Sequence, residues 1–297
     1  MTDPQLQTIA DLARAGRHAD AVQAATSALA AAQRHALLDQ RIHSLVALCE
    51  LPRALADAQA QLALAEQTRS QPRSQAQRAA ALCNLAMVQS RQEYNTQALQ
   101  TAESALQAAQ AATAAQRPAL VALALLRQAM AALSTDSALA ERSATDAAQR
   151  FEILRDAAHQ GQALRVLASV KLAEADTREH RALAEQAVAL ARQAGDASGL
   201  ARAIMTRDQS DDDLAVRVRG LHEAHRVARD AGNLEQQATA EHNLCLTYAR
   251  LGLLRRARRL MLPSRAPARL RSPRRSSRRS PARRPSSRAR AARWSAA

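Results

Sequence analysis

Aromatic residues are almost absent from this sequence of 297 residues, which holds one tryptophan, one phenylalanine and two tyrosines. Apolar residues nevertheless make up 47% of the chain, so alanine and leucine must supply most of the buried surface. Both residue types favour helices over strands. Proline is also missing from residues 119–262, as an uninterrupted helical region requires. The composition therefore predicts an all-helical body.

Cysteine and long apolar runs are equally scarce. Cys49, Cys83 and Cys245 are far apart and odd in number, so we expect buried free thiols rather than disulfides. The longest apolar run, residues 119–126, is too short to span a bilayer. The N-terminus lacks the basic and apolar regions of a signal peptide. These absences predict a soluble, cytoplasmic protein.

Acidic residues are missing from the C-terminal end of the chain. From Arg255 onward the sequence contains 16 arginines and no aspartate or glutamate, and the net charge of the whole chain is +15. The rest of the chain is therefore close to neutral. The overall charge alone is no argument that the body binds nucleic acid.

Apolar residues recur at helical spacing through the body of the chain, and short turns separate successive stripes. The pattern predicts helix pairs whose second members end near residues 33, 67, 110, 150, 193 and 230. Residues 187–196 align with residues 224–233 at an offset of 37, and Gly195 and Gly232 fall where a helix needs a left-handed cap. Helix-pair repeats of this length bury their apolar faces by stacking on neighbours, which gives a superhelix with a groove.

Residues 243–257 carry the most specific pattern in the sequence. The residues at the spacing of a known repeat motif are Asn243, Leu244, Tyr248, Gly252 and Ala257. Cys245 and Leu254 replace a consensus glycine and a consensus tyrosine. The chain thus resembles the tetratricopeptide-repeat family, in particular its bacterial signalling and regulatory members.

This resemblance implies an all-α fold, a right-handed α-solenoid of about six to seven antiparallel helix pairs over residues 1–262. A disordered basic tail would follow over residues 263–297. The resemblance also implies a protein-interaction scaffold that binds a peptide or protein partner in its concave groove. The sensory part of a truncated bacterial regulator is one form that such a scaffold takes.

Motifs for catalysis, cofactors or metals are not found in the sequence. No glycine-rich phosphate loop and no nucleophile elbow occur, so we expect neither enzyme activity nor a cofactor. His222 and His225 lie three residues apart, but no nearby cysteine or carboxylate completes a metal site. The run Asp211–Asp213 is typical of a helix N-terminus rather than of a cation site.

Two asparagine–arginine pairs are the candidate peptide-binding residues of the body. Asn84 and Arg91, like Asn243 and Arg250, are seven residues apart and share one helix face. The family resemblance implies that such an asparagine contacts a peptide backbone, and the arginine beside it suits a carboxylate. We therefore expect all four side chains to be partly exposed on the concave side. The alternative is that they are ordinary solvated positions.

The neighbouring apolar residues provide a check on this assignment. Leu85, Leu244 and Tyr248 lie on a different stripe of the same helices, so they should be buried between helices if the asparagines face the groove.

The arginine- and serine-rich tail leaves two interpretations open. As a functional segment it would bind nucleic acid through phosphate contacts, with Arg274, Arg275, Arg278 and Arg279 as the candidate residues. As a frameshift product it would have no function, which its restricted composition after residue 262 favours. The last repeat would then be unfinished, and its uncovered apolar face would promote self-association.

Overall fold

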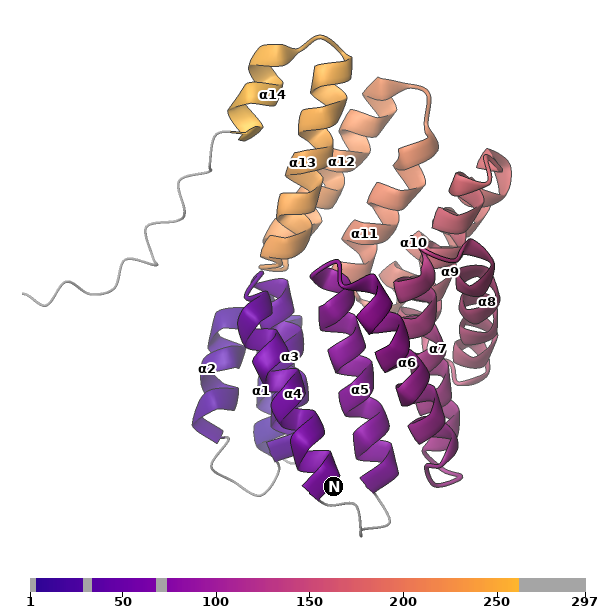
Figure 1. Ribbon diagram of the computed structural model, residues 1–297. Helices are drawn as coiled ribbons and strands as arrows, with labels where there is room; N and C mark the ends of the chain where they lie inside the picture. Colours follow the sequence, from indigo (N-terminus) through magenta and orange to yellow (C-terminus); the bar gives the residue numbers. More distant parts are fainter. Residues whose placement is uncertain (1–3, 29–33, 68–73, 262–297) are drawn as a thin grey trace, which may run out of the picture. The chain divides into compact units, whose positions relative to one another are not determined.

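The computed structural model describes residues 4–28, 34–67 and 74–261. All regular secondary structure in these ranges is helical (Figure 1), as the composition predicted. In chain order the α-helices are α1 (Pro4–Arg14), α2 (His18–Ala28), α3 (Arg34–Ala47), α4 (Leu51–Gln67), α5 (Ser74–Arg91), α6 (Asn95–Gln110), α7 (Arg117–Ala132), α8 (Ser137–Ile153), α9 (Ala157–Ala173), α10 (Thr177–Ala194), α11 (Ala197–Arg207), α12 (Leu214–Asp230), α13 (Leu234–Arg250) and α14 (Leu254–Met261). A 3₁₀ turn, η1 (Asp208–Ser210), follows α11.

Consecutive helices pack against one another in antiparallel pairs along the whole described chain. Each odd-numbered helix also contacts the next odd-numbered helix, from α1–α3 through to α11–α13. In the described residues the even-numbered helices do not pack on one another in this way. The odd-numbered helices therefore form the inner layer of a curved stack, and the predicted α-solenoid is confirmed.

Alanine allows the helices of this stack to approach closely. In α6 the fully buried residues Ala98, Ala102, Ala105 and Ala109 are spaced by four, three and four, which is one face of a helix. A large side chain at these positions would push neighbouring helices apart. Small side chains at these positions therefore leave room for neighbouring helices to pack closely without bulky aromatic residues.

Four turns between helices in the second half of the chain share one construction. A residue with positive φ is followed by an aspartate or asparagine that caps the next helix. The pairs are Arg155–Asp156, Ala175–Asp176, Gly195–Asp196 and Gly232–Asn233. In each pair the capping side chain accepts a hydrogen bond from the backbone N–H three residues ahead, at 2.8–3.1 Å. The predicted left-handed glycines at 195 and 232 are confirmed.

Two turns that are far apart in the sequence meet at the inner layer. The α1–α2 turn at Gly16 touches the α12–α13 turn at Ala231 and Gly232 so closely that neither glycine has room for a Cβ. His18 also interacts with the backbone of Ala231, and α13 packs on α3. The contact brings the start of α13 onto the inner layer, beside α3 and α5.

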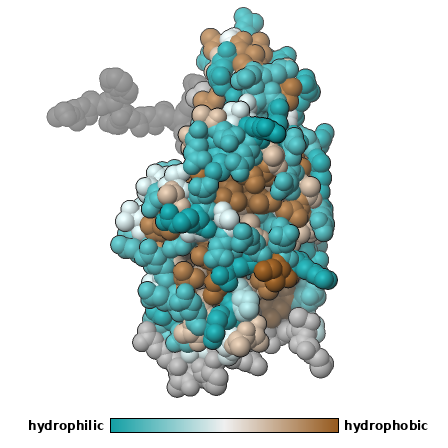
Figure 2. All heavy atoms as spheres, turned by 90° about the vertical axis from the view of Figure 1, so that its right-hand side faces the viewer, coloured by the Kyte–Doolittle hydropathy of each residue, from teal (hydrophilic) through white to brown (hydrophobic). Residues whose placement is uncertain are grey.

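The surface combines hydrophilic cover with apolar patches, as the face nearest α8 shows (Figure 2). The exposed leucines include Leu246 on α13, Leu251 and Leu253 in the α13–α14 turn, and Leu254 at the start of α14. The self-association that the sequence suggested for this end stays a prediction. No helix among the described residues is long and apolar enough to cross a membrane.

The cysteines are free, as expected, but not all of them are buried. Cys83 is fully buried, and burial raises the pKa of its thiol to about 12. Cys245 is half-buried. The prediction was wrong for Cys49, which is exposed because it occupies the left-handed position in the α3–α4 turn.

Candidate functional site

A cavity of about 210 Å³ lies on the inner layer of the stack. Its walls come from α3, α5, α7, α9 and α11, and further lining residues come from the start of α13 and from either side of the α1–α2 turn. The ionisable residues that line it include His43, Arg91, Arg127, His159, Arg202 and Glu235. We call this space the inner cavity.

Four consecutive inner helices each contribute one arginine at or beside the inner cavity. Arg91, Arg127, Arg165 and Arg202 come from α5, α7, α9 and α11, and we call them the arginine cluster. They are 36, 38 and 37 residues apart, which matches the period of the helix pairs. One arginine per repeat therefore projects toward the same region of the inner layer.

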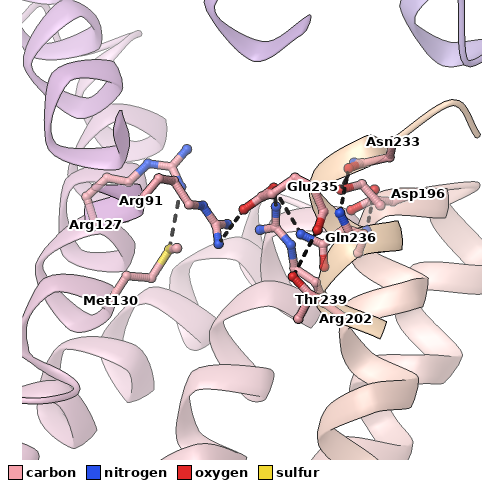
Figure 3. Close-up of polar contacts among 11 residues, drawn as sticks. Arg91, Arg127, Met130, Asp196, Arg202, Asn233, Glu235, Gln236 and Thr239 are labelled. Atoms are coloured by element: carbon pink, nitrogen blue, oxygen red, sulfur yellow. Dashed lines mark hydrogen bonds and ion pairs between the residues drawn. The ribbon is translucent and has the colours of Figure 1, made fainter. Parts of the chain in front are cut away.

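The N-terminal turn of α13 provides the carboxylate that pairs with this cluster. Glu235 lies between two arginines, with its oxygens 3.0 Å from Arg91 and 2.9 Å from Arg202 (Figure 3). Gln236 donates a further hydrogen bond to Glu235 at 2.9 Å. Burial alone would raise the pKa of Glu235, but Arg202 and Arg91 outweigh burial and hold this pKa below its ordinary value. Glu235 is therefore ionised at neutral pH.

The other two arginines of the cluster have no carboxylate partner among the described residues. The Arg127 side chain is nearly enclosed, with 4% of the residue exposed, and its hydrogen bond goes to the Met130 sulfur at 3.6 Å. The Nε atoms of all four cluster arginines are buried and have no hydrogen-bond acceptor within the described ranges. Burying a charged donor without a partner costs free energy. The cluster is thus short of acceptors.

Mutual repulsion within the cluster acts in the same direction as burial. Burial, followed by the neighbouring arginines, lowers the pKa of Arg91 to about 9. Burial and Arg202 lower the pKa of Arg165 to about 10. Burial also lowers the pKa of Arg127. All three shifts express the same physical state, in which positive charge is crowded into a partly enclosed space.

Nearby carboxylates other than Glu235 are occupied elsewhere. Asp196 caps α11 by accepting from Gly199 N–H at 2.8 Å, and Asp39 accepts from the Asn84 amide at 2.6 Å. His43 also lines the cavity, and this residue is exposed. The inner cavity therefore keeps an excess of positive charge and of hydrogen-bond donors. Such a site can bind a carboxylate or a phosphate group.

The structure corrects the predicted position of Asn84. The residue is 3% exposed, not partly exposed, and its amide donates to Asp39 and, at 3.0 Å, to Gln61. Helical phase explains the error, because α5 sits between α3, α4, α6 and α7 and buries most of its circumference. Arg91, the partner of Asn84 in the predicted pair, does line the inner cavity and is half-buried.

The second predicted pair lies together, but away from the arginine cluster. Asn243 is half-buried, Arg250 is exposed, and both line a cavity of about 250 Å³ between α11, α12 and α13. The Asn243 amide contacts the Met205 sulfur at 3.9 Å. A role in peptide binding for either pair stays a prediction.

The three apolar residues predicted to be buried beside the asparagines are buried. Leu85, Leu244 and Tyr248 are buried, with 8%, 2% and 7% of each residue exposed. Their burial confirms the phase of the two helices, although in α5 the neighbouring stripe is buried as well.

The histidine pair and the acidic run that the sequence offered as metal-site candidates have structural roles. His222 bonds to the Tyr248 hydroxyl at 2.8 Å and His225 to Glu241 at 2.9 Å. Asp213 caps α12 by accepting from Ala215 N–H at 2.7 Å, as predicted for this acidic run. In the described part of the chain no three His, Cys, Asp or Glu side chains come together as a metal site.

The nucleic-acid candidates of the tail cannot be placed in the same way. Arg274, Arg275, Arg278 and Arg279 lie outside the described residues, so nucleic-acid binding by the tail stays a prediction.

Three of the four cluster arginines, and their carboxylate partner, are not among the site residues predicted from the sequence. A signal for the arginines was present, because Arg127, Arg165 and Arg202 recur at the period of the helix pairs. No local pattern marks Glu235, which meets Arg91 only because the turns at Gly16 and Gly232 touch.

Comparisons with known proteins place this fold. No protein-family model and no curated protein matches the sequence. A solved Rap protein complexed with competence and sporulation factor superposes with a TM-score of 0.61, over 86% of this chain and 73% of the Rap chain, at 13% identity. BtubC (BKLC) from P. vanneervenii superposes with a TM-score of 0.54, over 71% of this chain and 88% of BtubC, at 14% identity.

At these identities the likeness shows the fold alone. The fold is a tetratricopeptide-like α-solenoid, and the resemblance inferred from residues 243–257 is confirmed at that level.

Proposed function

We propose that this chain is a non-catalytic scaffold that captures a peptide, or a segment of a partner protein, on its inner layer at the inner cavity. The observation that carries the proposal is the arginine cluster, which offers buried donors without acceptors in the hollow of a helical-repeat stack. A ligand that supplies acceptors would remove a cost that the free protein bears.

The comparisons support the same proposal. The Rap structure holds competence and sporulation factor, so a stack of this fold can carry a bound factor. By extension, we propose that the chain serves in regulation, as the sensory part of a larger bacterial signalling system.

Photo-crosslinking with peptides selected from a random display library tests the proposal. A photoreactive residue replaces Gln162, which lines the inner cavity, and in a control replaces Gln149, which is exposed on α8. We expect selected peptides to crosslink at 162 and not at 149. Crosslinking at 149 alone, or a selection that enriches no peptide, would contradict the proposal.

A further inference from the structure

The inner cavity has the composition of an anion site, and its charge balance indicates what it lacks. We infer that it holds an oxyanion, a carboxylate or phosphate group of the ligand, bound by Arg127 together with Arg91 and Arg202. The inference deepens the proposed function by naming the chemistry of the ligand.

The inner cavity has more hydrogen-bond donors than acceptors. A guanidinium has five N–H donors and no acceptor, and three such groups line the inner cavity. Glu235 accepts from Arg91 and Arg202 but does not reach Arg127 in the described contacts. Arg127 is almost fully buried, and its Nε has no acceptor. An oxyanion in the cavity would supply the missing acceptors.

The packing around position 127 does not require an arginine. Its neighbours one helical turn away on α7 are apolar, and Ala124 and Ala131 among them are fully buried. Methionine has a similar length and would fill the same space without an unpaired charge. In the free protein Arg127 should therefore lower stability rather than raise it. A binding residue shows this behaviour, whereas an arginine that supports the fold does not.

The volume of the inner cavity limits the size of the ligand group that it can hold. Pockets that enclose a whole drug-sized ligand have volumes of roughly 300–1,000 Å³. The inner cavity, at about 210 Å³, is smaller. It therefore suits a small free anion or one charged end of a longer ligand, such as the C-terminal carboxylate of a peptide.

Glu235 is the internal competitor of this anion. It occupies Arg91 and Arg202 from the end of α13 that the Gly16–Gly232 contact holds in place. An incoming oxyanion would share or take over these donors. Removing the charge of Glu235 should therefore strengthen anion binding.

Thermal unfolding of the full chain in phosphate and in chloride, at equal ionic strength, tests the inference. We expect inorganic phosphate to raise the Tm of the wild type by about 5–10 °C when it exceeds its Kd roughly a hundredfold. Arg127→Met should have a higher Tm than the wild type in chloride and no response to phosphate. The control Arg142→Met, which changes an exposed residue of α8, should respond as the wild type does.

Glu235→Gln is the second variant. It should have a lower Tm in chloride and a larger phosphate response than the wild type. The inference is overturned if Arg127→Met lowers the Tm and keeps the response, or if Glu235→Gln responds no more than the wild type.

Peptides distinguish the two sources of the anion. A random pentapeptide pool with free C-termini should raise the Tm where the same pool with amidated C-termini does not, if the anion is a chain-end carboxylate. A response to phosphate alone identifies a phosphate ligand. If neither phosphate nor the free pool raises the Tm, the inference fails.

Failure of the inference and failure of the proposed function give different results. Crosslinking of peptides at position 162 without any anion response would refute only the anion site. An anion response without peptide capture at 162 would refute only the scaffold function.

Discussion

Replacing Gly232 with alanine should open the contact between the α12–α13 turn and the α1–α2 turn. Gly232 has a φ of 62°, and a Cβ at this position would overlap the carbonyl oxygen of Gly16. Gly195 is the ideal control, because it holds the equivalent position in the internal repeat. Its φ is 64°, and a Cβ there would have no heavy atom within 4 Å.

Both substitutions place alanine in a left-handed conformation, but only Gly232→Ala also creates a steric overlap. A left-handed conformation costs a non-glycine residue roughly 1–2 kcal/mol, so Gly195→Ala should lower the free energy of unfolding by about that amount. Gly232→Ala adds a steric overlap, and overpacking of this kind costs about 1–3 kcal/mol more. Separating the turns would also move Glu235 away from Arg91.

Urea unfolding followed by circular dichroism measures both variants under the same conditions. We expect Gly232→Ala to be less stable than Gly195→Ala by about 1–3 kcal/mol. Gly232→Ala should also weaken the protection of Glu235 and its neighbours from hydrogen exchange. Equal stability of the two variants would refute the contact between the turns, and with it the placement of Glu235 in the arginine cluster.

Two further predictions concern single side chains of the described helices and turns. Asn84→Ala should lower the free energy of unfolding by about 1–3 kcal/mol, because it leaves the buried acceptors of Asp39 and Gln61 without a donor. Asn243→Ala should change the free energy of unfolding by less than about 0.5 kcal/mol. Equal losses of stability for the two variants in urea unfolding would contradict this prediction. Ala175→Gly should stabilise the chain by about 0.5–1 kcal/mol, because Ala175 has a φ of 64°, which glycine adopts more readily than alanine. The control Ala182→Gly, inside α10, should destabilise the chain by about 1 kcal/mol. Thermal unfolding measures both changes as shifts in Tm.

The fold could be predicted from the sequence because each helix and most of its ends are determined by residues that are close together in the chain. Alanine- and leucine-rich stripes at helical spacing define each helix, and glycines such as Gly195 mark where helices end. Stacking of consecutive pairs then follows, since each unit buries its apolar face only on its neighbours. Non-glycine residues such as Ala175 also take the left-handed position, and those turns carried no glycine signal.

The candidate site depends on contacts that are distant in the sequence. Helical phase placed Leu85 and Tyr248 correctly, but it could not show that α5 is surrounded on the stripe that carries Asn84. Glu235 is separated from Arg91 by 144 residues, and their pairing depends on how far the stack curves. That curvature sums small rotations over several repeats, so no single motif encodes it.

The central claim is that the inner cavity captures the ligand through the arginine cluster. Calorimetric titration of a peptide selected on the full chain into the wild type, Arg127→Met and Arg142→Met tests it most directly. Loss of a hydrogen bond between charged groups costs about 1.5–3 kcal/mol, so the account predicts that Arg127→Met weakens binding roughly ten- to a hundredfold. Arg142→Met should bind as the wild type does. Equal affinity of the wild type and Arg127→Met would contradict the account.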